Sequence, residues 1–142
     1  MAVDEIVEGK EYYLYKVHTD KSLGYEVYGK WDYVRLASAS HGGTAVIFER
    51  DPVYSHKYYI RMKNSSYSDH VYLTEDSKGW VYLDKKSEAS RFKFFLDAFG
   101  RITISHHNRG DFFIHEREGK NWLSTDGGSN GHKGNIFDVK KA

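Results

Sequence analysis

A short pattern of strands that recurs along the chain constrains the fold more than any other feature of the sequence. A shift of 46 residues places YYL at residues 12–14 on YYI at residues 58–60, and VIF at residues 46–48 on FKF at residues 92–94. These segments are rich in aromatic and β-branched residues, which favour β-strands. Short strands that repeat in a fixed order predict a fold built from copies of one unit.

The clearest part of the repeat is a predicted hairpin at residues 70–84, HVYLTEDSKGWVYLD. Aliphatic residues alternate with polar or aromatic ones on both sides of a polar turn at residues 75–79, which is the period of two half-buried strands. If the aliphatic side chains face the core, the opposite face carries large rings. These rings are Tyr72, Trp80 and Tyr82.

A third, shorter copy completes the pattern. Residues 102–104 align with residues 58–60, and Leu123 aligns with Leu83. Because four landmarks keep their order in each copy, we expect one domain spanning residues 1–142 with three internal units. The predicted units cover residues 9–53, 54–100 and 101–142.

Twelve short strands in three units of four resemble the β-trefoil, in which a six-stranded barrel is closed at one end by three hairpins. This resemblance implies an all-β fold. A closed barrel also leaves no exposed strand edge, which suits a chain with 12 Tyr, 8 Phe and 3 Trp. A β-sandwich is the alternative.

Charge and composition argue against several functional classes. The chain has 21 basic and 20 acidic residues, so it lacks the strong positive field that drives nucleic-acid binding. No cysteine is present, which excludes disulfides and thiolate metal sites. The adjacent His106 and His107 would face opposite sides of a strand, so a metal site is not expected, and nothing indicates a cofactor.

The sequence contains neither a signal peptide nor an apolar run long enough to cross a membrane. We therefore expect a cytoplasmic protein without integral membrane association, although secretion by a non-classical route stays open. No nucleophile elbow, P-loop, HExxH or dinucleotide fingerprint is present. The chain is accordingly expected not to be an enzyme, and no catalytic residue is assigned.

The third unit combines an aromatic residue with polar side chains in a pattern suited to sugars. Sugar-binding sites pair a flat ring with imidazole, carboxylate or amide groups that bind hydroxyls. The predicted carbohydrate-binding residues of this unit are His115, Trp122, Asp126 and His132. In the second unit, Trp80 and Asp84 are predicted to contribute to a related pocket.

These residues resemble the trefoil lectins of the mussel galactose-binding type. In that family a Leu-His step precedes a His-x-Asp-x-His strand, which Ile114-His115 and Asp126 match here, while Ser124 replaces the first His of the second motif. The general layout also resembles R-type lectins, although the Gln-x-Trp motif is absent. The resemblance implies a non-enzymatic lectin whose partners are glycans or glycoconjugates, with up to three pockets acting together.

A protein-binding trefoil is the alternative function, either a cytoskeletal binder similar to hisactophilin and fascin or a protease inhibitor that presents one loop. Two short motifs have functions only in particular contexts: the integrin-type tripeptide at residues 109–111 and the glycosylation sequon at Asn64. Exposed aromatic residues on one flank could also form a self-association face, so a homodimer stays open.

Overall fold

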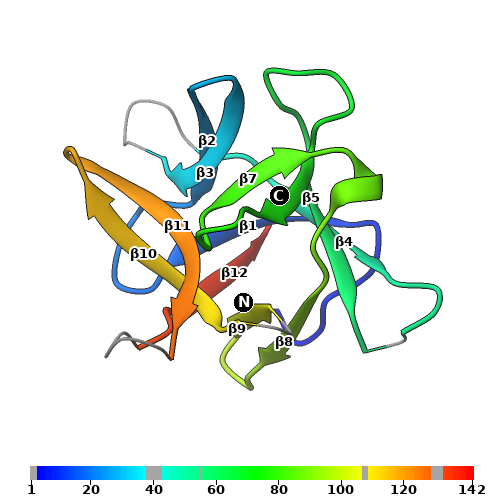
Figure 1. Cartoon of the computed structure of the whole chain (residues 1–142). Helices are drawn as coiled ribbons and strands as arrows, with labels where there is room; N and C mark the ends of the chain where they lie inside the picture. Colours follow the sequence, from blue (N-terminus) through cyan, green and yellow to red (C-terminus); the bar gives the residue numbers. More distant parts are fainter. Residues whose placement is uncertain (1–2, 38–42, 55, 107–108, 129–132) are drawn as a thin grey trace.

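The computed structural model describes residues 3–37, 43–54, 56–106, 109–128 and 133–142. Six strands pair in a closed ring in the order β1, β4, β5, β8, β9, β12 and back to β1, all antiparallel (Figure 1). These barrel strands are β1 (Glu11–Lys16), β4 (Val46–Arg50), β5 (Tyr58–Met62), β8 (Phe92–Leu96), β9 (Arg101–His106) and β12 (Phe137–Lys141).

Three further pairs of strands form hairpins beside the barrel (Figure 1). They are β2 (Leu23–Tyr28) with β3 (Trp31–Leu36), β6 (Tyr72–Glu75) with β7 (Val81–Asp84), and β10 (Asp111–Arg117) with β11 (Lys120–Gly127). The predicted β-trefoil with twelve strands is therefore confirmed, and the sandwich alternative is excluded because the sheet closes on itself. A single turn of 3₁₀ helix, η1 (Lys86–Glu88), precedes β8.

The hairpins contact one another in a cyclic order. Tyr33 of β3 pairs with Tyr82 of β7, Trp80 beside β7 pairs with Ser124 of β11, and Trp122 of β11 pairs with Arg35 of β3. The partner in each pair lies two residues after the aromatic residue of the next hairpin. Tyr82 follows Trp80 by two, Ser124 follows Trp122 by two, and Arg35 follows Tyr33 by two. Tyr33, Trp80 and Trp122 are therefore equivalent residues of the three units.

This cyclic pairing corrects the alignment of the third unit. The residue after each equivalent aromatic is Val34, Val81 or Leu123, and all three side chains are fully buried. Leu123 therefore corresponds to Val81 rather than to Leu83, a difference of two residues. The two hairpins differ in length, because Val81 pairs with Glu75, six residues earlier, whereas Leu123 pairs with Ile114, nine residues earlier.

The core explains why the hairpin pattern could be recognised from sequence. Leu73, Val81 and Leu83 are buried, whereas Tyr72, Trp80 and Tyr82 on the opposite face stay partly exposed, as predicted. Buried side chains from the barrel strands and hairpins form one continuous cluster. Within the described residues, no helix is long and apolar enough to cross a bilayer.

Candidate functional site

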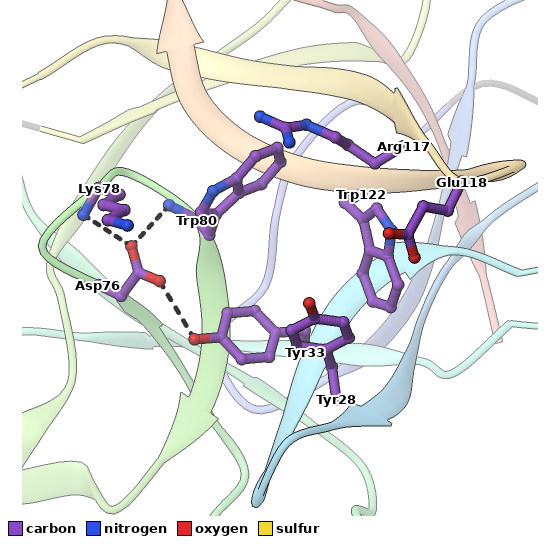
Figure 2. A pocket seen from close by; sticks show the side chains of 8 residues that line it. All are labelled: Tyr28, Tyr33, Asp76, Lys78, Trp80, Arg117, Glu118 and Trp122. Atoms are coloured by element: carbon purple, nitrogen blue, oxygen red, sulfur yellow. Dashed lines mark hydrogen bonds between the residues drawn. The ribbon is translucent and has the colours of Figure 1, made fainter.

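A pocket with a volume of about 320 Å³ opens where the three hairpins meet (Figure 2). This volume is near the lower end of the range of about 300–1,000 Å³ that is common for small-molecule sites. Every hairpin contributes to the lining, which consists of Tyr28, Tyr33, Asp76, Lys78, Trp80, Arg117, Glu118 and Trp122. The pocket can hold a small ligand or one end of a longer one.

The three repeat-equivalent aromatic residues, Tyr33, Trp80 and Trp122, all line this pocket. Each precedes a buried aliphatic residue on its strand, so strand alternation turns the ring away from the core. Figure 2 shows Trp80 and Trp122 on opposite sides of the pocket, with Tyr33 between them. The internal repeat thus supplies one ring from each unit to a shared pocket.

Tyr28 adds a fourth ring at the end of β2. Its ring centroid lies 5.9 Å from that of Trp122 and 6.1 Å from that of Tyr33, and both contacts are edge-to-face. Its side chain is 62% exposed, so much of this ring is open to solvent. A ring held by two neighbours but left accessible provides a stacking surface for a ligand.

Asp76 fixes the turn that carries Trp80. Its Oδ1 accepts hydrogen bonds from the backbone N–H groups of Lys78 and Trp80, at 2.9 and 3.0 Å, and its Oδ2 accepts one from the Tyr33 hydroxyl at 3.1 Å. Burial, together with the negative charge of Asp76, raises the pKa of Tyr33 to about 12. The hydroxyl therefore stays protonated at neutral pH, and the Tyr33 ring is anchored to the opposite hairpin.

Charged side chains of both signs surround the rings. The guanidinium carbon of Arg117 lies 5.5 Å from the centroid of Trp80, and that of Arg35 lies 5.7 Å from the centroid of Trp122. Glu118 has a positive φ of 55° in the two-residue turn between β10 and β11. The pocket therefore offers guanidinium, ammonium and carboxylate groups around an aromatic floor.

His115 and Asp126, two of the predicted site residues, form a pair that contacts Trp80 but does not line the pocket. His115 Nε2 lies 2.9 Å from Asp126 Oδ2, and the imidazole makes an edge-to-face contact with Trp80 at 5.2 Å between centroids. His115 is also the cross-strand partner of Trp122. The structure thus brings His115, Asp126, Trp80 and Trp122 together, with the two tryptophans lining the pocket and the His–Asp pair supporting them.

Of the other two predicted site residues, the structure describes only Asp84, and it lies elsewhere. Asp84 is buried, does not line the pocket, and accepts a 2.7 Å hydrogen bond from the Tyr82 hydroxyl. Burial and this hydrogen bond raise the pKa of Tyr82, and the bond joins two residues of the same strand, β7. His132 lies outside the described residues.

Sequence reasoning missed the pocket residues that are contributed by turns and by the first unit. Those residues are Tyr28, Tyr33, Asp76, Lys78, Arg117 and Glu118. One signal was present, because the alignment of DYVRL at residues 32–36 with GWVYL at residues 79–83 places Tyr33 on Trp80. The two sides of the pocket come from different units, so only the cyclic contact between hairpins identifies them as neighbours.

The integrin-type tripeptide at residues 109–111 makes contacts within the fold. Arg109 is paired with Glu75 at 3.0 Å and donates a hydrogen bond to the Ser77 carbonyl. A Cβ at Gly110 would lie 2.2 Å from the Gly127 carbonyl oxygen, and burial raises the pKa of Asp111. These contacts explain the three residues by packing. Among the described residues, no cluster of three or more His, Asp or Glu side chains could hold a metal ion.

Neither a protein-family model nor a curated protein matches the chain. Solved structures match it along almost its whole length, at identities that support the fold alone. Lysenin, solved as a pore, has a TM-score of 0.79 at 12% identity and covers 100% of this chain, which spans 50% of lysenin. Lysenin in complex with phosphocholine has a TM-score of 0.77 at 13% identity, and the match covers 97% of this chain and 46% of lysenin.

Protease inhibitors are the second kind of neighbour. Alocasin, a protease inhibitor from giant taro, has a TM-score of 0.72 at 16% identity, and the match covers 100% of this chain and 98% of alocasin. A mutant of the Bauhinia bauhinioides kallikrein inhibitor in complex with bovine trypsin has a TM-score of 0.72 at 21% identity, and the match covers 96% of this chain and 93% of the inhibitor. Together the neighbours support the β-trefoil fold.

Proposed function

We propose that this protein is a non-enzymatic carbohydrate-binding protein and that the pocket between the hairpins is its binding site. The observation that carries the proposal is the convergence of Tyr33, Trp80 and Trp122, one ring from each unit, on a pocket rimmed by charged groups. The expected ligand is a saccharide residue that enters this pocket.

The chemistry of the pocket fits a sugar because a pyranose has two kinds of surface. Its C–H face packs on an aromatic ring, and the hydroxyls around its rim exchange hydrogen bonds with charged side chains. Glu118 can accept from hydroxyls, and Lys78 and Arg117 can donate to them. Since Asp76 already accepts three hydrogen bonds, it holds the pocket in shape before a ligand arrives.

A glycan array with the purified protein tests this function. We expect saturable binding that a soluble sugar competes, and the same signal should fall when Trp80 and Trp122 are replaced. Silence across the array would contradict the proposal. Phosphocholine belongs among the competitors, because lysenin has been solved with it and aromatic cages also suit quaternary ammonium groups. Competition by phosphocholine but by no sugar would assign the pocket to an organic cation instead.

His115→Ala is predicted to weaken sugar binding by about two- to tenfold, the value of one aromatic pair, with little change in stability. The imidazole packs edge-to-face against Trp80, and its side chain is partly exposed. Sugar titration and thermal unfolding of the same sample measure both effects. Glu116→Ala is the matched control, since Glu116 is the next residue of β10 and is exposed. Equal losses of affinity in both variants would remove His115 from the site.

A second candidate function, protein binding, is favoured by the loop between β4 and β5. Val53 and Tyr54 are exposed there, with Val53 77% accessible. Asp51 Oδ1 accepts hydrogen bonds from the backbone N–H groups of both residues, and Oδ2 is paired with Arg91. Apolar side chains whose backbone is held by hydrogen bonds suit a protein partner, and trypsin is the partner of one structural neighbour. Trypsin inhibition assays test this candidate directly.

The same loop gives a prediction about pH. The backbone N–H of Val53, followed by Arg91, lowers the pKa of Asp51. A lowered pKa means that the carboxylate stabilises the fold above its unfolded pKa of about 3.9, and that this contribution is lost as the pH falls through the folded pKa. Asp51→Asn should therefore be less stable than the wild type at pH 7, and the difference should shrink in acid. Urea unfolding of both proteins at pH 7 and in acid measures the difference in unfolding free energy. A difference that does not change with pH would contradict the stabilising role of the Asp51 carboxylate.

A further inference from the structure

The pocket is one end of a longer row of aromatic rings. From Trp122 the row passes to the β2–β3 hairpin, crosses to Tyr82 of β7, returns to Trp31 of β3 and ends in the segment before β6. Each ring centroid lies 5.1 to 6.5 Å from the next. We call this set the aromatic row, and its members in spatial order are Trp122, Tyr28, Tyr33, Tyr82, Trp31, His70 and Tyr67.

Exposed rings occur at intervals along the aromatic row. Tyr28 is 62% exposed, Trp31 is 39% exposed and Tyr67 is 37% exposed, whereas the rings between them are half-buried. Tyr28 and Trp31 are cross-strand partners at the tip of the β2–β3 hairpin, so their side chains lie on the same face. The row therefore offers stacking surfaces beyond the pocket as well as within it.

Trp31 is held in place by its neighbours in the row. Its ring contacts Tyr82 edge-on at 5.1 Å and His70 at 5.8 Å. The His70 Nδ1 lies 2.9 Å from the Ser68 carbonyl, and its Nε2 lies 3.9 Å from Asp84. An aromatic ring beside an imidazole, both partly exposed, is the same combination that Trp80 and His115 form at the pocket, where Trp80 alone lines it.

We propose that the ligand is an oligosaccharide chain, with one residue in the pocket and later residues on the aromatic row as far as a second subsite at Trp31, His70 and Tyr67. This inference rests on the proposed function and names its ligand class. A chain of sugar rings matches the row because it also alternates apolar faces with hydroxyls. Each occupied subsite adds to the affinity, because the translational and rotational entropy of the ligand is lost only once, when its first residue binds.

Calorimetric titration with oligosaccharides of increasing length tests the inference. The probes are β1,4-linked oligomers of glucose and of N-acetylglucosamine with one to five rings, together with the best-binding glycan from the array and its terminal monosaccharide. The affinity of the wild type should rise at least about tenfold from monosaccharide to full chain. In Trp31→Ala this gain should disappear, while the affinity for the monosaccharide stays as in the wild type.

The outcomes separate the two proposals. Equal affinity for short and long chains, or an undiminished gain in Trp31→Ala, would overturn the extended site and leave the pocket intact. Failure of every saccharide to bind would overturn the proposed function and the inference with it. Because Trp31 also packs on Tyr82, Tyr67→Ala is the second variant and should lose part of the same gain. Phe99→Ala, an exposed ring outside the aromatic row, is the control and should keep all of it.

Discussion

Trp122→Ala should weaken saccharide binding by about tenfold, and the double variant Trp80→Ala/Trp122→Ala by about a hundredfold. An aromatic contact contributes about 0.5–1.5 kcal/mol beyond the area that it buries, and about 1.4 kcal/mol corresponds to a factor of ten. Both rings line the pocket and lie on opposite sides of it (Figure 2). Removing Trp122 leaves Trp80 as the one tryptophan of the pocket, and removing both leaves the ligand with Tyr28 and Tyr33 alone.

The Trp122 ring also contacts Tyr28 and lies under the Arg35 guanidinium, so its removal disturbs more than the ligand contact. Trp122→Tyr separates these effects because it keeps a ring at the same position, and it should retain most of the affinity. Isothermal titration with the best-binding glycan measures all the variants. Unchanged affinity in the double variant would place the sugar elsewhere on the molecule.

Phe112→Ala is expected to cost about 3–5 kcal/mol of unfolding free energy, which is a large part of the total of about 5–15 kcal/mol typical for a domain. Phe112 is fully buried, and its ring packs edge-on against Phe92 at 5.3 Å and Phe137 at 6.3 Å. These contacts attach the β10–β11 hairpin to barrel strands β8 and β12. Alanine would leave a cavity that the closed barrel cannot collapse to fill.

Urea unfolding of Phe112→Ala alongside Phe95→Ala measures this cost. Phe95 is an exposed phenylalanine on β8, so the same substitution there should change stability by no more than about 0.5 kcal/mol. Similar losses in the two variants would mean that Phe112 does not connect the hairpin to the barrel. A variant that is unfolded in buffer would agree with the predicted size of the effect.

The fold could be predicted because its units repeat within the sequence. Strand alternation marks which residues are buried, as with Leu73 and Leu83 against Tyr72 and Tyr82, and the spacing of about 46 residues marks the units. The predicted alignment of the third unit is two residues out in β11, because Leu123 follows its partner Ile114 by nine residues in the third hairpin, whereas Val81 follows Glu75 by six in the second. Alternation has a period of two, so a shift of two residues keeps the same face and goes undetected.

The candidate site could be predicted only in part, for reasons of distance along the chain. His115, Trp122 and Asp126 lie on two strands of one hairpin, so their proximity follows from local pairing. Tyr33 and Asp76 belong to different units, and nothing in their sequence neighbourhoods says that the Tyr33 hydroxyl reaches that carboxylate. Asp84 has the residue type of a sugar ligand but is buried against Tyr82, and burial of a single carboxylate is not encoded in the alternation.

The indole N–H signals provide the most direct test, because the chain has only three tryptophans, Trp31, Trp80 and Trp122. Their resonances can be assigned by single substitutions and followed by NMR while the best-binding glycan is added. We expect saturable shifts of the Trp80 and Trp122 signals at the concentrations at which the glycan binds. Saturable binding that leaves both signals unmoved would contradict a site between the hairpins.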